Sequence, residues 1–163
     1  MDLHELETGP LWRFSDFNAA EVPGNIVGVY TVWEDTTLIY VGIGGLRVRY
    51  REPDDESEPV NPVKGLRGRL EQHRNGDRSG DKFCIYVCDR FVLPSLSAEE
   101  IRHVSRGELS LDARTRDWIN RNYAFRYIQA SRGSEARKIE DDVQRGALSA
   151  GPPLLNPKVE KTH

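Results

Sequence analysis

Two short apolar segments separated by a polar turn constrain the fold of this chain more than any other feature. Residues 26–33 and 38–41 are β-branched, aromatic or otherwise apolar apart from one glycine, and the polar run Glu-Asp-Thr-Thr lies between them at 34–37. This pattern predicts a β-hairpin, because such side chains favour strands and polar clusters favour turns. Tyr30 and Tyr40 would then lie close together on neighbouring strands. Hairpins often contain aromatic residues and glycines for structural reasons, so the hairpin alone indicates no function.

A basic helix is predicted after the hairpin, at residues 65–74. Leu66, Leu70 and His73 recur there at helical spacing. Arg69 lies four residues before the histidine, so both side chains share one face of the helix. A basic helix with a lone histidine is usually a solvated surface, and the segment becomes informative only together with the hairpin.

The order and spacing of these segments resemble the GIY-YIG nuclease superfamily. Gly-Val-Tyr at 28–30 is followed by Tyr-Val-Gly at 40–42, ten residues on from the first tyrosine, and then by the helix with Arg69 and His73. The family combines two tyrosines, a helical arginine and a downstream glutamate in one site. The histidine after the arginine is more similar to the branch of homing endonucleases and some restriction enzymes than to the branch with a lysine beside the first tyrosine.

A later segment and a late asparagine extend the resemblance. Residues 135–143 look like the family's late helix, whose metal-binding glutamate would be Glu140, and Asn156 looks like its terminal asparagine. Apolar residues on both sides of the glutamate favour this alignment, while a slip would select Asp141 or Asp142 instead. The asparagine would lie near the glutamate, or would only cap a turn before the following proline.

The resemblance implies a divalent-metal-dependent endonuclease that hydrolyses DNA. Tyr30 would be the general base, either as a phenolate or by passing a proton onward. Because an ordinary tyrosine has a pKa of about 10, it needs a neighbour such as His73 to accept or share its proton. Tyr40 would hydrogen-bond the attacking water or the scissile phosphate. Arg69 would offset transition-state charge through its planar guanidinium. Glu140 would hold Mg²⁺ or Mn²⁺, since Mg²⁺ is typically bound by one or two carboxylates, waters and a substrate phosphate.

Further residues are expected at the substrate. Gly28, Gly42 and Gly44 would remove side chains where a nucleic-acid backbone approaches closely. The arginines Arg67 and Arg74 on the basic helix are expected to bind DNA. These five residues form the predicted substrate-binding set.

The fold class predicted from the whole pattern is α/β of the α+β type, with a small mixed or antiparallel three-stranded central sheet flanked by helices. A length of 163 residues with 37% hydrophobic content suits one domain at 1–163 that buries about 70% of its unfolded surface. Within it, residues 1–22 are expected to be an N-terminal extension packed on the domain. Residues 95–121 are expected to be a helical insertion, either a charge-balanced surface or a segment that faces DNA.

Several further elements are predicted from local pattern. Strands are expected at 82–88, where Cys84 and Cys88 would be buried free thiols on one face, and at 123–129. Helices are expected at 97–106 with a serine cap, at 111–120, and from a Ser134 cap to Gly146.

The net charge of the chain argues against a DNA partner, but the uneven distribution of its charges along the sequence still permits one. A formal charge of −3 opposes such a partner, because phosphate binding depends on Lys and Arg that release counterions. Residues 52–59 carry five acids and no base, and subtracting these five charges leaves about +2 for the remainder. The segment 51–63 is therefore expected to be a mobile acidic insertion, either a solvated loop or a segment that occupies the phosphate groove when DNA is absent.

The expected location follows from what the sequence lacks. It has neither an 18-residue apolar run nor a signal-peptide pattern, which predicts a soluble, cytoplasmic protein without a membrane partner. DNA is the expected partner, and a homodimer or an operon partner is left open. A restriction or defence enzyme is favoured, but a structure-selective repair nuclease, a nucleic-acid-binding module without catalysis and a protein-interaction domain stay open.

Overall fold

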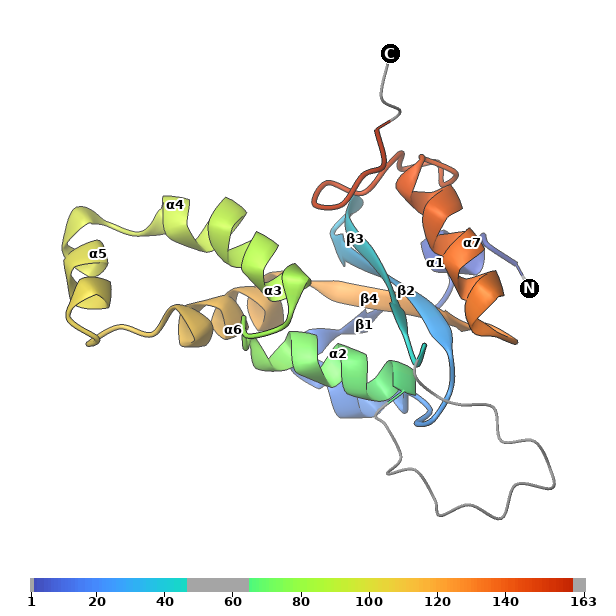
Figure 1. The fold of residues 1–163 in the computed structure, drawn as a ribbon, viewed down its shortest axis with the longest axis horizontal. Coiled ribbons are helices and arrows are strands. Elements are labelled where there is room, and N and C mark those ends of the chain that lie inside the picture. The colour runs from blue at the N-terminus through green and yellow to red at the C-terminus, as the bar shows by residue number, and fades with distance from the viewer. Residues whose placement is uncertain (1, 47–64, 160–163) are drawn as a thin grey trace.

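Four strands form one antiparallel sheet in the part of the chain that the structure describes. The computed structural model of the protein describes residues 2–46 and 65–159, so the predicted acidic insertion at 51–63 lies outside the described residues. The strands are ordered β1 (Trp12–Arg13), β4 (Ala124–Gln129), β2 (Gly28–Glu34) and β3 (Thr37–Gly44), and each neighbouring pair is antiparallel. Figure 1 shows helices on both sides of this sheet. The predicted α+β class is confirmed, but four strands are described rather than three.

The predicted hairpin is formed by β2 and β3. The turn between them contains Asp35, whose φ of 50° is the left-handed value that tight hairpin turns require. Tyr30 pairs with Gly42, and Tyr40 lies two residues earlier on β3, so the two tyrosines are diagonal neighbours on one face. Their ring centroids are 6.4 Å apart. The expected proximity of the two tyrosines is confirmed.

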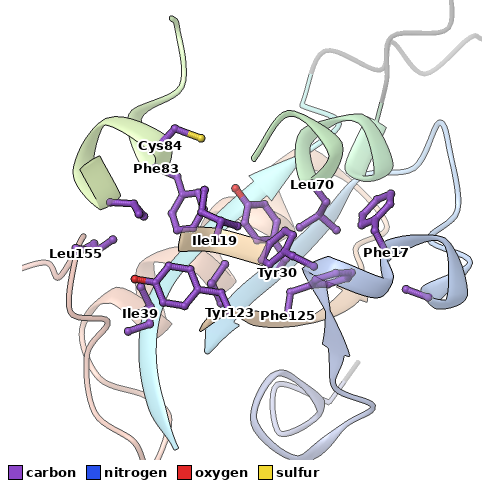
Figure 2. Packing of buried hydrophobic residues seen from close by; sticks show 14 of the residues in the cluster. Phe17, Tyr30, Ile39, Leu70, Phe83, Cys84, Ile119, Tyr123, Phe125 and Leu155 are labelled. Carbon is purple, nitrogen blue, oxygen red and sulfur yellow. The ribbon is translucent and has the colours of Figure 1, made fainter. Parts of the chain in front are cut away.

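One face of the sheet is covered by η1 (Phe14–Ala20), α2 (Gly65–Asn75), α3 (Lys82–Val87) and α6 (Leu111–Asn122). Aromatic side chains dominate the core between these helices and the strands, as Figure 2 shows. The side chains of this core that are at most 1% exposed include Phe17, Tyr30, Leu70, Phe83, Tyr123 and Phe125. Because interiors are close-packed, the position of the Tyr30 ring is fixed by its neighbours.

The opposite face is covered by α1 (Glu5–Thr8) and α7 (Gly133–Gln144). Leu6 from α1 and Ala136 and Val143 from α7 are fully buried there, against Val29 and other strand residues that alternate with those of the first face. Both α2 and α7 contact β3 from opposite faces. This edge of the sheet is therefore where residues from the two helical layers can meet.

The strand predicted at 82–88 is wrong. The segment is the helix α3, which continues into the π-helical η2 (Cys88–Val92) and the short α4 (Leu93–Ser95). Asp81 caps α3, since its Oδ1 accepts a hydrogen bond from the backbone N–H of Cys84 at 3.2 Å. A short apolar run fits a buried helix as well as a strand. Cys84 and Cys88 are buried free thiols as predicted, but they lie one helical turn apart.

The other helix predictions are largely confirmed. Ser97 and Glu100 form the predicted capping box of α5 (Ala98–Ser105), and α6 follows. Figure 1 shows α4 and α5 at the end of a helical arm that extends away from the sheet. Ser134 does not cap α7, which begins at Gly133, whereas Gly146, with φ of 97°, follows its end as predicted.

The N-terminal and C-terminal segments pack on this framework. Phe14 and Phe17 are buried, as expected for residues that pack on the domain. The segment after α7 runs beside β3, where the N–H groups of Leu154 and Leu155 donate to backbone carbonyls of that strand. Within the described ranges, no helix has the length and apolar character needed to cross a bilayer.

Candidate active site

A cleft of about 290 Å³ opens at the β3 edge of the sheet. Side chains of β2, β3, α2, α7 and the loop before α3 line it. Five of the six predicted catalytic residues gather there, namely Tyr30, Tyr40, Arg69, His73 and Glu140. A larger hollow of about 530 Å³ lies over β1, β4 and α1, but no His, Cys, Lys or Arg lines it. The titratable groups suited to catalysis are therefore concentrated in the smaller cleft.

A continuous chain of hydrogen bonds runs from the cleft into the core. The Tyr30 hydroxyl lies 2.5 Å from Nε2 of His73, and Nδ1 of the same ring lies 2.6 Å from Oδ2 of Asp81. A carboxylate only accepts, so Nδ1 carries the proton that it donates to Asp81. Nε2 is then left as an acceptor, and the Tyr30 hydroxyl donates to it.

Local sequence explains how this chain is assembled. A Cβ at Gly42 would overlap the Tyr30 hydroxyl, so the glycine opposite the tyrosine gives the hydroxyl its path toward α2. On α2, Leu70 is fully buried, and His73 follows it by three residues and therefore also points inward. The His73 ring packs against Phe83 of α3 with centroids 4.7 Å apart.

The environment sets the protonation states of these groups. Burial, followed by the nearby Tyr40, raises the pKa of Tyr30 well above its ordinary value, so the hydroxyl keeps its proton at neutral pH. Burial also lowers the pKa of His73, although the hydrogen bond to Asp81 opposes this shift. Burial would raise the pKa of Asp81, but hydrogen bonds from His73 and Cys84 outweigh it and lower the pKa. A neutral imidazole beside a carboxylate is therefore the resting state.

Two cationic side chains border the cleft. Arg69 lies one turn before His73 on α2, is half-buried, and donates from Nη1 to Oε1 of Gln72 at 3.3 Å. Lys82 is exposed at the start of α3. Within residues 2–46 and 65–159 no carboxylate forms an ion pair with either cation, so both are free to meet an anionic ligand.

Glu140 is the acid that α7 brings to the cleft. Burial raises the pKa of its half-buried carboxyl, and no side chain or backbone group in the described part of the chain donates a hydrogen bond to it. The neighbouring Asp141 points elsewhere, since it pairs with Arg145 at 2.8 Å and with Lys158. Neither Asp141 nor Asp142 lines the cleft, so Glu140 is the acid of this helix that lies beside the tyrosines.

The two arginines predicted to bind substrate lie outside the cleft. Arg67 and Arg74 hold their guanidinium groups over the ring of Phe17, 5.8 and 5.7 Å from its centroid. Arg67 also pairs with Glu71 at 3.3 Å. Residues two and five positions from Arg69 lie on other faces of the helix, so α2 directs Arg67 and Arg74 toward η1 rather than toward β3.

The predicted glycines serve the protein's own packing. A side chain at Gly28 would meet Leu66, and one at Gly44 would meet the backbone of the same leucine, so α2 already fills the space expected for DNA. Of the three predicted glycines, only Gly42 lines the cleft, and the Tyr30 hydroxyl fills the space beside it.

Asn156 does not line the cleft either. Its Oδ1 accepts from the N–H of Val41 at 3.2 Å, and its Nδ2 donates to the carbonyl of Val41 at 2.7 Å. Both polar groups of the side chain are thus engaged by the backbone of β3, next to Tyr40. Asn156 fixes the C-terminal segment to the edge strand, and its catalytic role stays a prediction.

Two sets of donors in the cleft can be considered for a cation. Ligand atoms of His73, Asp81 and Cys84 lie within 4.8 Å of one another, but all three side chains are buried and hydrogen-bonded, and burial raises the pKa of the Cys84 thiol. A cation there would have to displace protons from nitrogen and sulfur. Glu140 instead offers a hard oxygen without a donor, which is the chemistry that Mg²⁺ prefers.

Sequence reasoning missed the other two charged residues of the cleft, Asp81 and Lys82. Both lie at the start of the segment that was expected to be a strand. An aspartate directly before an apolar run is a common helix cap, and recognising α3 would have drawn attention to that position. That the second carboxylate oxygen reaches His73 has no signal in the sequence, because the contact depends on how α2 and α3 pack.

Comparison with known proteins gives no match for this chain among protein-family models, curated proteins or solved structures. The resemblance noted in the sequence therefore stays a prediction.

Proposed function

We propose that this protein is a divalent-metal-dependent endonuclease of the GIY-YIG type that hydrolyses DNA phosphodiester bonds. One observation carries the proposal. Five residues chosen from their order in the sequence come from β2, β3, α2 and α7, and they line a single cleft. The chemistry of these five, a proton relay, a guanidinium and a free carboxylate, matches what phosphodiester hydrolysis requires.

Activation of water is assigned to Tyr30 and His73. Since the raised pKa of Tyr30 keeps the hydroxyl protonated, a stored phenolate is not the base. Instead, the attacking water passes a proton to the Tyr30 oxygen while the Tyr30 hydroxyl passes its own proton to Nε2 of His73, 2.5 Å away. The products are a nucleophilic hydroxide and an imidazolium, so the proton count balances.

Stabilisation of the phosphate is assigned to the cations at the rim. Arg69 presents a planar guanidinium that can bind two phosphate oxygens at once. Lys82 adds a second charge on the side of the cleft formed by α3. Tyr40, with a pKa raised by burial, stays a neutral donor to a phosphate oxygen or to water.

Glu140 would hold the metal ion. Its oxygen ligand, partial exposure and lack of a hydrogen-bond donor among the described residues fit a cation that keeps several waters and binds substrate phosphate. When bound, Mg²⁺ or Mn²⁺ supplies Lewis acidity at the phosphate and at the leaving oxygen. The raised pKa of Glu140 has burial as its main cause, and a nearby cation would lower it again.

The test compares plasmid cleavage by the wild type, Glu140→Gln and Asp142→Asn. Each substitution removes one carboxylate charge from α7, but only Glu140 lines the cleft. We expect the wild type to nick or linearise supercoiled DNA in Mg²⁺ or Mn²⁺, EDTA to abolish cutting, and Asp142→Asn to remain active. Glu140→Gln should lose at least about 100-fold in rate.

The other outcomes separate the remaining functions. Equal activity of wild type and Glu140→Gln would contradict the metal assignment. Cleavage confined to branched or flapped DNA would identify a structure-selective repair nuclease. DNA binding that weakens with salt, but without cleavage of any substrate, would identify a binding module that has lost catalysis.

A further inference from the structure

We infer that Asp81 is a positioning residue of the proton relay, which holds His73 with the unprotonated Nε2 facing Tyr30 and stabilises the imidazolium that forms. This inference deepens the proposed function and rests on it. Asp81 touches neither water nor phosphate in the proposed reaction. It acts through His73, the group that accepts the proton.

The two carboxylate oxygens of Asp81 have separate partners. Oδ1 accepts from the backbone N–H of Cys84 at 3.2 Å and so caps α3. Oδ2 accepts from Nδ1 of His73 at 2.6 Å and from the Cys84 thiol at 3.4 Å. A side chain that is 1% exposed thereby satisfies both oxygens, which makes a buried charge tolerable.

A helix cap alone would not require an aspartate here. Serine and asparagine cap helices about as well, because a cap needs a single acceptor. A group that caps α3 and also accepts a hydrogen bond from Nδ1 of His73 needs two acceptors. An ionised carboxylate has no donor, so it cannot favour the tautomer with the proton on Nε2. An aspartate at position 81 therefore fits a second role beside the helix cap, which is to accept a hydrogen bond from His73.

Asp81 is the anion closest to His73 within the described residues. Besides Asp81, the titratable groups around the imidazole are Tyr30 from β2, Tyr40 from β3 and Cys84 from α3, all of which are neutral at pH 7. Arg69, on the same helix, lowers the pKa of His73. Glu140 and Lys82 line the same cleft. Among the groups around His73, Asp81 therefore supplies the negative charge that favours the imidazolium form of this histidine.

The step is balanced without moving a proton to Asp81. Water gives a proton to the Tyr30 oxygen, Tyr30 gives its hydroxyl proton to Nε2, and the Nδ1 proton stays on nitrogen, hydrogen-bonded to Oδ2. Burial of an unpaired imidazolium would be costly, and the adjacent carboxylate offsets that cost. The same division of labour between an aspartate and a histidine recurs on unrelated folds.

Two substitutions at position 81 separate the cap from the relay. Asp81→Asn keeps an acceptor for the Cys84 N–H, and its amide then donates to Nδ1, which forces the proton onto Nε2. Asp81→Ser also keeps the cap but does not reach the ring. Ser110→Ala, which removes the cap of α6 at a residue that does not line the cleft, is the control for loss of a cap.

The readouts are plasmid cleavage and the ¹⁵N signals of the His73 imidazole in the full-length protein, assigned with His73→Gln. We expect Nδ1–H in the wild type, Nε2–H in Asp81→Asn, and at least about a 100-fold loss of cleavage rate in Asp81→Asn. Asp81→Ser should lose less, because the imidazole remains free to adopt either form. Ser110→Ala should cleave like the wild type.

Failure of this inference is distinguishable from failure of the proposed function. A wild-type protein that carries Nε2–H, or an Asp81→Asn protein that cleaves at the wild-type rate, would overturn the role of Asp81 while leaving the nuclease intact. A wild-type protein that cleaves no DNA would overturn the nuclease, and with it the relay, even if the NMR signals show Nδ1–H.

Discussion

At the scale of single residues, the site depends on a missing side chain as much as on those present. Tyr30 is buried in the core, yet its hydroxyl reaches His73 across the position opposite it on β3. That position is Gly42, and no other residue type leaves the space open. The two glycine-tyrosine motifs of the hairpin are thus linked through packing, not through contact with a ligand.

Gly42→Ala should weaken both the fold and the reaction. The added methyl group would overlap the Tyr30 hydroxyl, and overpacking of this kind costs about 1–3 kcal/mol of unfolding free energy. Displacement of the hydroxyl from His73 should also slow DNA cleavage. Urea unfolding and plasmid cleavage measure the two effects.

The matched control is Gly24→Ala, because a Cβ at that position meets no atom within 4 Å. Its unfolding free energy should change by no more than about 0.5 kcal/mol. If Gly42→Ala were equally harmless, the close approach of Tyr30 to position 42 would be refuted.

The residues of the cleft were predictable to the extent that they belong to a motif. Tyr30, Tyr40 and Glu140 were selected because their order and spacing resemble a known family. Asp81 belongs to no such pattern, since its contact with His73 is made by the packing of two helices. Sequence reasoning could therefore select the residues of the cleft that belong to a motif. It could not select Asp81, which orients one of them.

At the scale of elements, the main failure of sequence reasoning was the identity of residues 82–88. The run Lys-Phe-Cys-Ile-Tyr-Val-Cys has the β-branched and aromatic content of a strand, but the packing of α3 against α2 and α6 overrides that preference. The hairpin at 28–44 and the helix at 65–75 were easier to predict, because turn residues or a helical period accompanied the composition. When a short apolar run has neither turn residues nor a helical period, tertiary contacts decide whether it forms a strand or a helix.

The edge strand β3 is covered by the segment that follows α7, and Asn156 anchors this contact. Asn156→Ala removes two hydrogen bonds to Val41 and should lower the unfolding free energy by about 1–3 kcal/mol. Urea titration measures this loss. At a temperature where the variant is folded, DNA cleavage should be nearly unchanged. A large loss of rate in a fully folded variant would instead restore the catalytic role that the sequence suggested.

At the scale of the whole molecule, charge distribution matters more than net charge. The chain carries −3 overall, yet the cleft is bordered by Arg69 and Lys82, while other arginines are turned away or paired with acids. A net acidic protein can therefore still place two cations beside one cleft, because interactions between exposed charges are screened beyond about 8–10 Å.

The salt dependence of DNA binding tests whether the cations at the cleft contact DNA. In a Glu140→Gln background, which prevents cleavage, Arg69→Ala should reduce the slope of log binding constant against log salt by about 1, since one phosphate contact is lost. Arg67→Ala removes the same charge from the same helix but on the face toward Phe17. Its slope should match the parent protein, and equal effects of the two substitutions would place DNA elsewhere on the surface.

The chain order of the cleft also has a consequence for synthesis. Of the elements that line the cleft, β2, β3 and α2 leave the ribosome first, α3 follows, and α7 comes last, after the helical arm and β4. Glu140 emerges 67 residues after His73, a delay of several seconds at ordinary rates of translation. Until α7 docks on the sheet, the nascent chain lacks the carboxylate assigned to the metal ion. On the proposed function, the nascent chain would therefore not cleave nucleic acid while it is being made.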